Sequence, residues 1–193
     1  MLGLINRSIE CFLRDTYGDK TWGRVASQTG VTRFEVLLSY DDHLTELLLD
    51  QAQSVLAKDR SQLLEDLGTY IVAHPKQESV RRLMRFGGAD FPDFILSLDD
   101  LADRARLAIS DLQLPQIEAW QDEADHYSIF CRSIFPGCGH VLAGLIRAMS
   151  DDYGALSVVD YEGVDGASEV LAVQLLDTTF SEGRDFVLSV ETA

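Results

Sequence analysis

The periodicity of apolar residues changes at Pro115, and this change constrains the fold more than any other feature. Before Pro115, apolar residues recur at the three- and four-residue spacing of amphipathic helices. After it, short strand-like runs are separated by Gly, Asp and Ser turns, with one further helical segment among them. Helices followed by an antiparallel sheet with an inserted helix predict an α+β fold.

Local signals set the expected boundaries of the helices. Asp59, with a glutamine three residues later, is typical of a capping box, and the helix that it opens ends at Pro75. Asp90 as N-cap, with Pro92 in the first turn, predicts one long helix whose apolar stripe turns Ala102 toward the interior. Helices are expected before Gly18 and over about 22–30, 41–56, 59–75, 80–87 and 90–109.

The second part of the chain predicts strands joined by polar turns. Runs at 116–121 and 127–134 flank an acidic turn at 122–125, and further runs cover 156–161, 169–176 and 185–190. Pro136-Gly137 leads to the inserted helix, which carries Val141 and Leu145 on one face.

Composition and charge exclude several classes of partner. Sixteen basic residues against 32 acidic ones give a net charge of −16, which repels nucleic acid and anionic lipid, so neither partner is expected. No apolar run approaches the ~18 residues of a membrane span, and the N-terminal residues lack the pattern of a secretory signal. The three cysteines show no CxxC spacing and are odd in number, which argues against a disulfide framework. A cytoplasmic protein is expected.

Residues with catalytic chemistry form no recognisable constellation. The four histidines are not spaced with cysteines or carboxylates in the manner of a zinc site. There is no Gly-rich phosphate loop and no nucleophile elbow, so we do not expect an enzyme. Cys138, expected in a loop after Gly137, is the best candidate for a reactive thiol, and a redox-responsive protein using Cys138 stays open.

A series of short motifs, collinear over nearly the whole chain, resembles the haem nitric-oxide/oxygen-binding (H-NOX) domain. The motifs are Met1-Leu2-Gly3-Leu4-Ile5-Asn6, Asp15-x-Tyr17-Gly18 with Trp22, Tyr40-Asp41-Asp42, Leu67-Gly68-Thr69-Tyr70, Phe86-Gly87-Gly88, Phe94-x-x-x-Leu98-Asp99-x-Leu101, Pro136-Gly137 and Gly144-Leu145-Ile146. The resemblance implies a single domain over 1–193. A helical lobe over about 1–65 would pack on a lobe over about 66–193 that has an antiparallel sheet and inserted helices.

The resemblance also locates two parts of a haem site. In the family a histidine gives the iron its only protein bond, and the matching residue is Ala102, which has no lone pair to donate. The Tyr-x-Ser-x-Arg motif that holds the haem propionates corresponds to Cys131, Ser133 and Phe135, so the charged contact to a carboxylate is missing. The resemblance therefore implies that conventional haem ligation is lost and that no cofactor is bound, with haem as the alternative.

The other expected pocket positions are apolar. The resemblance places Ile5, Ile9, Ile71 and Val141 around the gas, with Ala102 opposite and Pro115 against the ring plane. These residues are either ordinary core or the lining of a cavity for another small hydrophobic or tetrapyrrole ligand.

By resemblance, the chain is a stand-alone, non-catalytic regulatory domain that acts through a protein–protein surface. The partner classes implied are a histidine kinase, a cyclic-di-GMP enzyme or a chemotaxis receptor. The alternative is a haem- or tetrapyrrole-binding NO/O2 sensor with a non-standard ligation mode.

Overall fold

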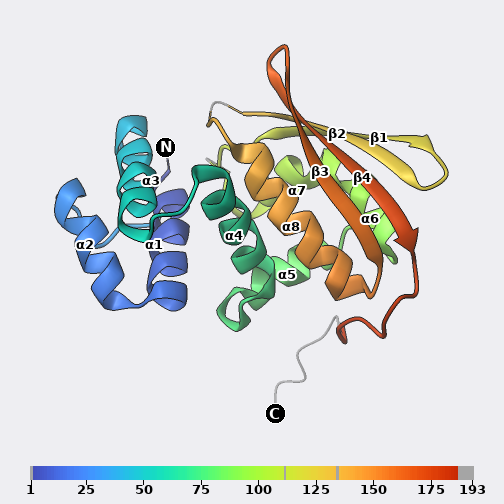
Figure 1. Ribbon diagram of the computed structural model, residues 1–193, viewed down its shortest axis with the longest axis horizontal. Coiled ribbons are helices and arrows are strands. Elements are labelled where there is room, and N and C mark those ends of the chain that lie inside the picture. Colours follow the sequence, from blue (N-terminus) through green and yellow to red (C-terminus); the bar gives the residue numbers. More distant parts are fainter. Residues whose placement is uncertain (1, 111, 134, 187–193) are drawn as a thin grey trace.

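The computed structural model describes residues 2–110, 112–133 and 135–186. The first four helices lie on one side of the molecule, and a twisted sheet lies on the other side with further helices against it (Figure 1). The helices are α1 (Gly3–Tyr17), α2 (Asp19–Thr29), α3 (Asp42–Leu56), α4 (Arg60–Ala73), α5 (Glu78–Arg85), α6 (Phe91–Leu96), α7 (Leu101–Ala108) and α8 (Cys138–Tyr153). The strands are β1 (Gln116–Glu123), β2 (His126–Arg132), β3 (Leu156–Asp165) and β4 (Ser168–Asp177).

The four described strands form one antiparallel sheet in the order β1-β2-β4-β3. The register pairs Ile117 with Cys131, Cys131 with Glu169 and Val159 with Val173. Helix α8 enters the chain between β2 and β3 and lies along the sheet (Figure 1). The predicted α+β fold, with helices first and an antiparallel sheet around an inserted helix, is confirmed.

Two apolar clusters fill the interior. The helical-lobe cluster joins α1–α4, and the sheet cluster joins the inner face of the sheet to α6 and α8. Buried members of the helical-lobe cluster are Ile9, Phe12, Leu13, Trp22, Val25, Ala26, Phe34, Leu48, Leu49, Ala52, Leu63, Leu64, Leu67 and Tyr70. Large members of the sheet cluster include Phe91, Phe94, Ile95, Leu98, Ile129, Leu142, Ile146, Met149 and Leu171.

Helices α4 and α8 approach each other closely because glycines stand at their crossing. A Cβ atom added to Gly68 would lie 2.0 Å from the carbonyl oxygen of Val141. One added to Gly144 would lie 1.9 Å from the carbonyl oxygen of Glu65. Any side chain at either position would therefore force the two backbones apart.

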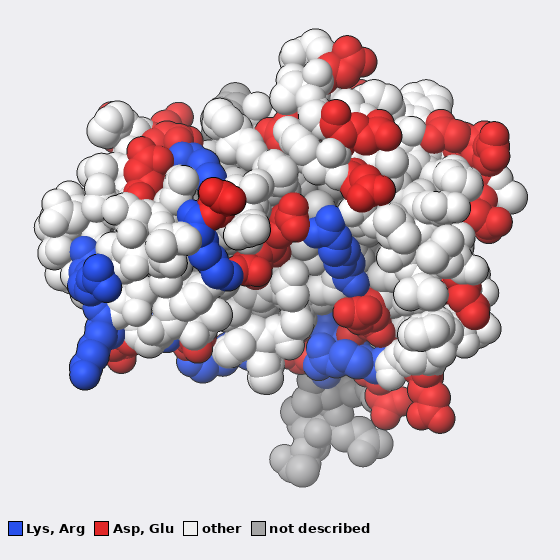
Figure 2. Space-filling model, viewed as in Figure 1, with Lys and Arg blue, Asp and Glu red and all other residues white. Residues whose placement is uncertain are grey.

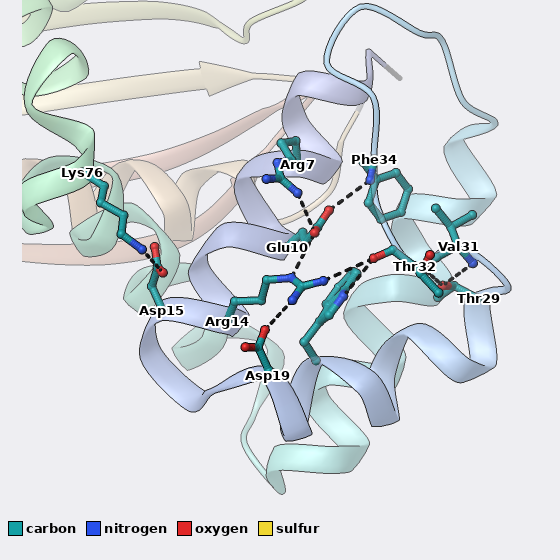
Figure 3. A network of polar contacts seen from close by, with 11 residues as sticks. Arg7, Glu10, Arg14, Asp15, Asp19, Thr29, Val31, Thr32, Phe34 and Lys76 are labelled. Carbon is teal, nitrogen blue, oxygen red and sulfur yellow. Dashed lines mark hydrogen bonds and ion pairs between the residues drawn. The ribbon is translucent and has the colours of Figure 1, made fainter.

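A buried carboxylate organises the polar interior of the helical lobe (Figure 3). Glu10 accepts hydrogen bonds from Arg7 Nη1 at 2.5 Å, from Arg14 Nε at 3.0 Å and from the backbone N–H of Phe34 at 3.0 Å. Two arginines hold one oxygen of Glu10 and a backbone N–H holds the other, so the charge of this buried carboxylate is compensated and both of its oxygens are hydrogen-bonded.

A second buried ion pair ties the end of the described chain to the sheet lobe. Arg81 Nε donates to Asp152 Oδ1 at 2.6 Å, and both side chains are almost wholly buried. Arg81 Nη2 also donates to the carbonyl of Asp185 at 2.9 Å, and the backbone carbonyl of Asp152 accepts from the N–H of Arg184.

The strand predicted at 185–190 is wrong for its first two residues, because Asp185 and Phe186 do not form a strand. The rest of that run lies outside the described residues.

Two further expectations about the helices are wrong. The helix expected over 90–109 is broken by a 3-10 turn at Ser97–Asp100, between α6 and α7. The break is explained by two side-chain hydrogen bonds, because Ser97 Oγ donates to the carbonyl of Phe94 at 2.8 Å and Asp99 accepts from the N–H of Ala119 at 2.6 Å.

Asp59 stands at the N-cap of α4, but its side chain makes no capping hydrogen bond, so the capping box is absent. Asp90 caps α6 as predicted, with its Oδ1 2.9 Å from the N–H of Asp93.

Among the described residues, none of the helices combines the length and apolar character needed to cross a membrane.

Candidate functional site

Most of the apolar pocket positions named above meet in the helical-lobe cluster. Ile9, on α1, is a buried member of this cluster. Ile5 on α1, Ile71 on α4 and Val141 on α8 are half-buried and pack against it. Phe135, from the connection between β2 and α8, packs against the same cluster. These five side chains therefore belong to one continuous apolar core.

Ala102, on the first turn of α7, belongs to neither of the two apolar clusters. It is 8% exposed, so it faces inward as its place on the apolar stripe predicts. Its neighbour Leu101 belongs to the sheet cluster, and Arg104, on the next turn, donates to the carbonyl of Ser97 at 2.9 Å. Pro115 is half-buried directly before β1.

The segment from Cys131 to Phe135 crosses from one cluster to the other. Cys131 is 1% exposed and belongs to the sheet cluster, whereas Phe135 packs in the helical-lobe cluster. Between them, Ser133 Oγ accepts a hydrogen bond from the N–H of Phe135 at 3.0 Å. The three side chains are thus engaged in apolar packing or in a local turn.

Glu169, on β4, holds the beginning of α8. Its carboxylate accepts from the N–H of Gly137 at 2.7 Å and from the N–H of Gly139 at 2.8 Å. The N-cap residue of α8 is Gly137, which has no side chain to cap the helix, so Glu169 supplies the acceptor from a strand. Nothing in the sequence pattern identifies Glu169 as a functional residue. The one available signal was a helix start without a capping side chain, and that signal does not point to any partner.

Two thiols meet at the same place. Cys131 is paired with Glu169 in the sheet, and Glu169 holds the residues on both sides of Cys138. The thiol of Cys131 donates a hydrogen bond to the sulfur of Cys138, which lowers the pKa of Cys138 and raises that of Cys131. Cys138 is the first residue of α8 and is half-buried, so its expected place in a loop is wrong. The spacing of Cys131 and Cys138 in the sequence does not indicate that their thiols lie close together.

The only histidine near this end of α8 is engaged with aromatic and acidic neighbours in the described structure. The ring of His140 stacks on Tyr161 with centroids 4.0 Å apart, and its Nδ1 lies 3.3 Å from Glu65 Oε1. The described residues contain no group of three or more His, Cys, Asp or Glu side chains that could hold a metal ion.

Two hollows lie over the exposed face of the sheet, away from the pocket positions. One, of about 270 Å³, is lined by residues of β1–β4 that include Asp122, Ser128 and Asp160. The other, of about 440 Å³, lies against β1 and β2 beside Trp120 and Phe130. Neither hollow is lined by Ala102 or by the residues of the helical-lobe cluster.

Comparison with known proteins places the fold. The sequence model of the haem-NO-binding (HNOB) family matches residues 2–159. Soluble guanylate cyclase gcy-31 of Caenorhabditis elegans is 26% identical over 161 residues, which make up 82% of this chain and 23% of that protein. The chain therefore spans less than a quarter of the length of that curated relative.

Solved structures agree with this match. An Fe(II) unliganded H-NOX protein from K. algicida has a TM-score of 0.78 and 14% identity, over 92% of this chain and 97% of that chain. A variant H-NOX protein from S. oneidensis has a TM-score of 0.79 and 13% identity over the same shares. A variant of the T. Tengcongensis H-NOX has a TM-score of 0.76 and 18% identity, over 93% of this chain and all of that chain. With a family match over most of its length and this shared fold, the chain belongs to the haem-NO-binding family and has the H-NOX fold of gas-sensor domains.

Proposed function

We propose that this chain is a non-catalytic regulatory domain of H-NOX type that has lost conventional haem ligation and acts through contact with another protein. The single observation that carries this proposal is Ala102. It takes the place of the iron-ligating histidine by resemblance, and its methyl group is buried and has no electron pair for a metal.

The residues at the propionate positions do not fit a haem either. Cys131 is buried in the sheet cluster, and Phe135 packs into the helical-lobe cluster, so neither offers a charged donor to a carboxylate. The hydroxyl of Ser133 is engaged with the backbone of Phe135. The donor set at these positions therefore fits neither the iron nor the propionates of a haem.

Surface chemistry supports a protein partner with basic groups. Exposed carboxylates lie along β1 and β3, at Glu118, Asp122, Asp160, Glu162 and Asp165, and Figure 2 shows acidic side chains gathered over the sheet. Such a surface favours a positively charged patch on the partner and disfavours nucleic acid. A histidine kinase, a cyclic-di-GMP enzyme and a chemotaxis receptor are the partner classes that we propose from the family resemblance.

Haemin titration of the full chain tests the proposal. We expect the protein to retain no stoichiometric Soret band through gel filtration. A retained stoichiometric band would overturn the proposal and favour a sensor that holds haem or a related tetrapyrrole in another ligation mode.

A variant that restores the missing side chains tests whether their absence is the reason that haem is not bound. Ala102→His combined with Cys131→Tyr and Phe135→Arg supplies an imidazole, a phenol and a guanidinium at the three positions. We expect this variant to retain at least about ten times more haem than the parent chain, equal to about 1.4 kcal/mol of binding free energy. Equal retention by a folded variant, verified by its circular dichroism, would refute the assignment of these positions.

A further inference from the structure

Three connected features of the structure bring the thiols of Cys131 and Cys138 together. The β2–β4 register sets Cys131 opposite Glu169. The carboxylate of Glu169 then binds the N–H groups of Gly137 and Gly139, on either side of Cys138. Finally, Cys138 packs against the apolar cluster of which Cys131 is a buried member, and the two thiols shift each other's pKa in opposite directions. Their disposition is therefore fixed by the sheet and by the start of α8, close to where these two elements meet in Figure 1.

We propose that Cys131 and Cys138 form a reversible, peroxide-sensitive dithiol–disulfide pair. The proposal concerns the junction between β2 and α8 and does not depend on whether haem binds. Cys138 is the residue that meets the oxidant, because it is half-buried while Cys131 is 1% exposed. Cys131 is the resolving residue, since it lies in the same apolar cluster and is the thiol that acts most strongly on Cys138.

The environments of the two thiols give them different reactivities. The hydrogen bond from Cys131 lowers the pKa of Cys138, and this effect outweighs burial and the neighbouring Glu169 carboxylate, which both raise it. Cys11, the third cysteine, is on α1, and burial raises its pKa. Because the thiolate is the nucleophile, Cys138 should react with peroxide before Cys11 does.

The atoms and electrons of the oxidation balance when hydrogen peroxide is the oxidant. The thiolate of Cys138 attacks one peroxide oxygen, the O–O bond breaks, and hydroxide leaves to become water, so Cys138 becomes a sulfenic acid. The sulfur of Cys131 then attacks the sulfur of Cys138, an S–S bond forms, and the S–O bond breaks. The released oxygen leaves as water with the proton of Cys131. Two thiols lose two electrons, one peroxide gains them, and exchange with a dithiol reductant restores the starting pair.

The location of the pair gives the disulfide a structural consequence. The segment 131–138 contains Phe135, which packs in the helical-lobe cluster, whereas Cys131 belongs to the sheet cluster. A disulfide would close this segment into a short ring and so restrict the link that joins the two apolar clusters.

Peptide mapping of the full chain tests the proposal. The protein is treated with a small excess of hydrogen peroxide, blocked with N-ethylmaleimide and digested with trypsin without reduction. Trypsin cuts after Arg106, Arg132 and Arg147, so the disulfide would join peptide 107–132 to peptide 133–147 in one species. We expect this cross-linked species, its loss on treatment with dithiothreitol, and alkylation of Cys138 at least about tenfold faster than that of Cys11 in the untreated protein.

Three single variants separate the roles. Cys11→Ser should keep the cross-link unchanged and serves as the matched control. Cys138→Ser should abolish the cross-link and leave Cys131 as a free thiol after peroxide. Cys131→Ser should leave Cys138 as a sulfenic acid that dimedone labels. Full alkylation of both cysteines after peroxide would overturn the proposal, and so would oxidation of Cys11 ahead of Cys138 or passage of Cys138 to the sulfinic acid in the parent chain.

Discussion

The close crossing of α4 and α8 predicts that the smallest possible side chain at Gly144 is destabilising. The Cβ atom of Gly144→Ala would lie 1.9 Å from the oxygen, 2.7 Å from the carbonyl carbon and 3.0 Å from the Cα of Glu65. All three are backbone atoms, so no rotation of a side chain relieves the contact. The helices would have to separate by about 1.5 Å to restore an ordinary van der Waals distance.

The expected size of the effect follows from two opposing contributions. Replacing glycine by alanine inside a helix favours folding by about 0.5–1 kcal/mol. Overpacking of a close-packed interior costs about 1–3 kcal/mol, and more where the backbone must move. We therefore expect Gly144→Ala to lower the free energy of unfolding by about 2 kcal/mol, which for a chain of this size is a fall in Tm of about 4–8 °C.

Urea and thermal unfolding followed by far-ultraviolet circular dichroism measure this effect. Gly23→Ala is the matched control, because a Cβ atom at this helical position on α2 would meet nothing within 4 Å. It should raise the free energy of unfolding by about 0.5–1 kcal/mol. The reasoning is refuted if Gly144→Ala is as stable as the parent, or if the two alanine variants change stability in the same direction.

Three further predictions concern polar groups. Asp152→Asn removes the buried one of the two carboxylates that pair with the Arg81 guanidinium, the other being Glu78. Urea unfolding should show a loss of about 3 kcal/mol in the free energy of unfolding, and a loss below about 1 kcal/mol would contradict this prediction. Glu169→Gln keeps an acceptor but removes its charge, so hydrogen exchange at the first turn of α8 should accelerate about tenfold while exchange in α2 is unchanged. Burial raises the pKa of Tyr70, hydrogen-bonded to Asp15, from 10.0 to about 12, so the folded state favours the neutral phenol. The stabilisation of the folded state by the neutral Tyr70 phenol is complete below pH 10 and is lost as the pH rises through 12. Tyr70→Phe should therefore lose less stability than the parent between these two pH values. Equal losses in the two proteins would count against the raised pKa of Tyr70.

Features encoded over short distances were predictable from the sequence. The Asp90 cap needs only the N–H of Asp93, three residues away, and the alternation within a strand follows from the pleat itself. The apolar stripe that turns Ala102 inward survives even though the helix is interrupted, because α7 still presents the same face.

Features that depend on distant partners were not predictable. The 3-10 turn before α7 depends on Asp99 reaching Ala119, and nothing in the local pattern of residues 97–100 specifies that bond. The contact between Cys131 and Cys138 depends in the same way on Glu169, which lies on a later strand. The pocket positions that family resemblance implies are divided between the two apolar clusters, with Phe135 in the helical-lobe cluster and Cys131 in the sheet cluster, and the sequence pattern does not indicate this division.

The carboxylate of Glu169 also has a consequence for any anion that approaches the start of α8. The two N–H groups it occupies are the kind of donors that phosphates and carboxylates use at helix beginnings. A group tethered within the same molecule competes at an effective concentration on the order of millimolar even for flexible linkers, and the sheet holds this one in place. A free anion would have to displace the Glu169 carboxylate from these N–H groups, so Glu169 acts as an intramolecular competitor of anion binding at the start of α8.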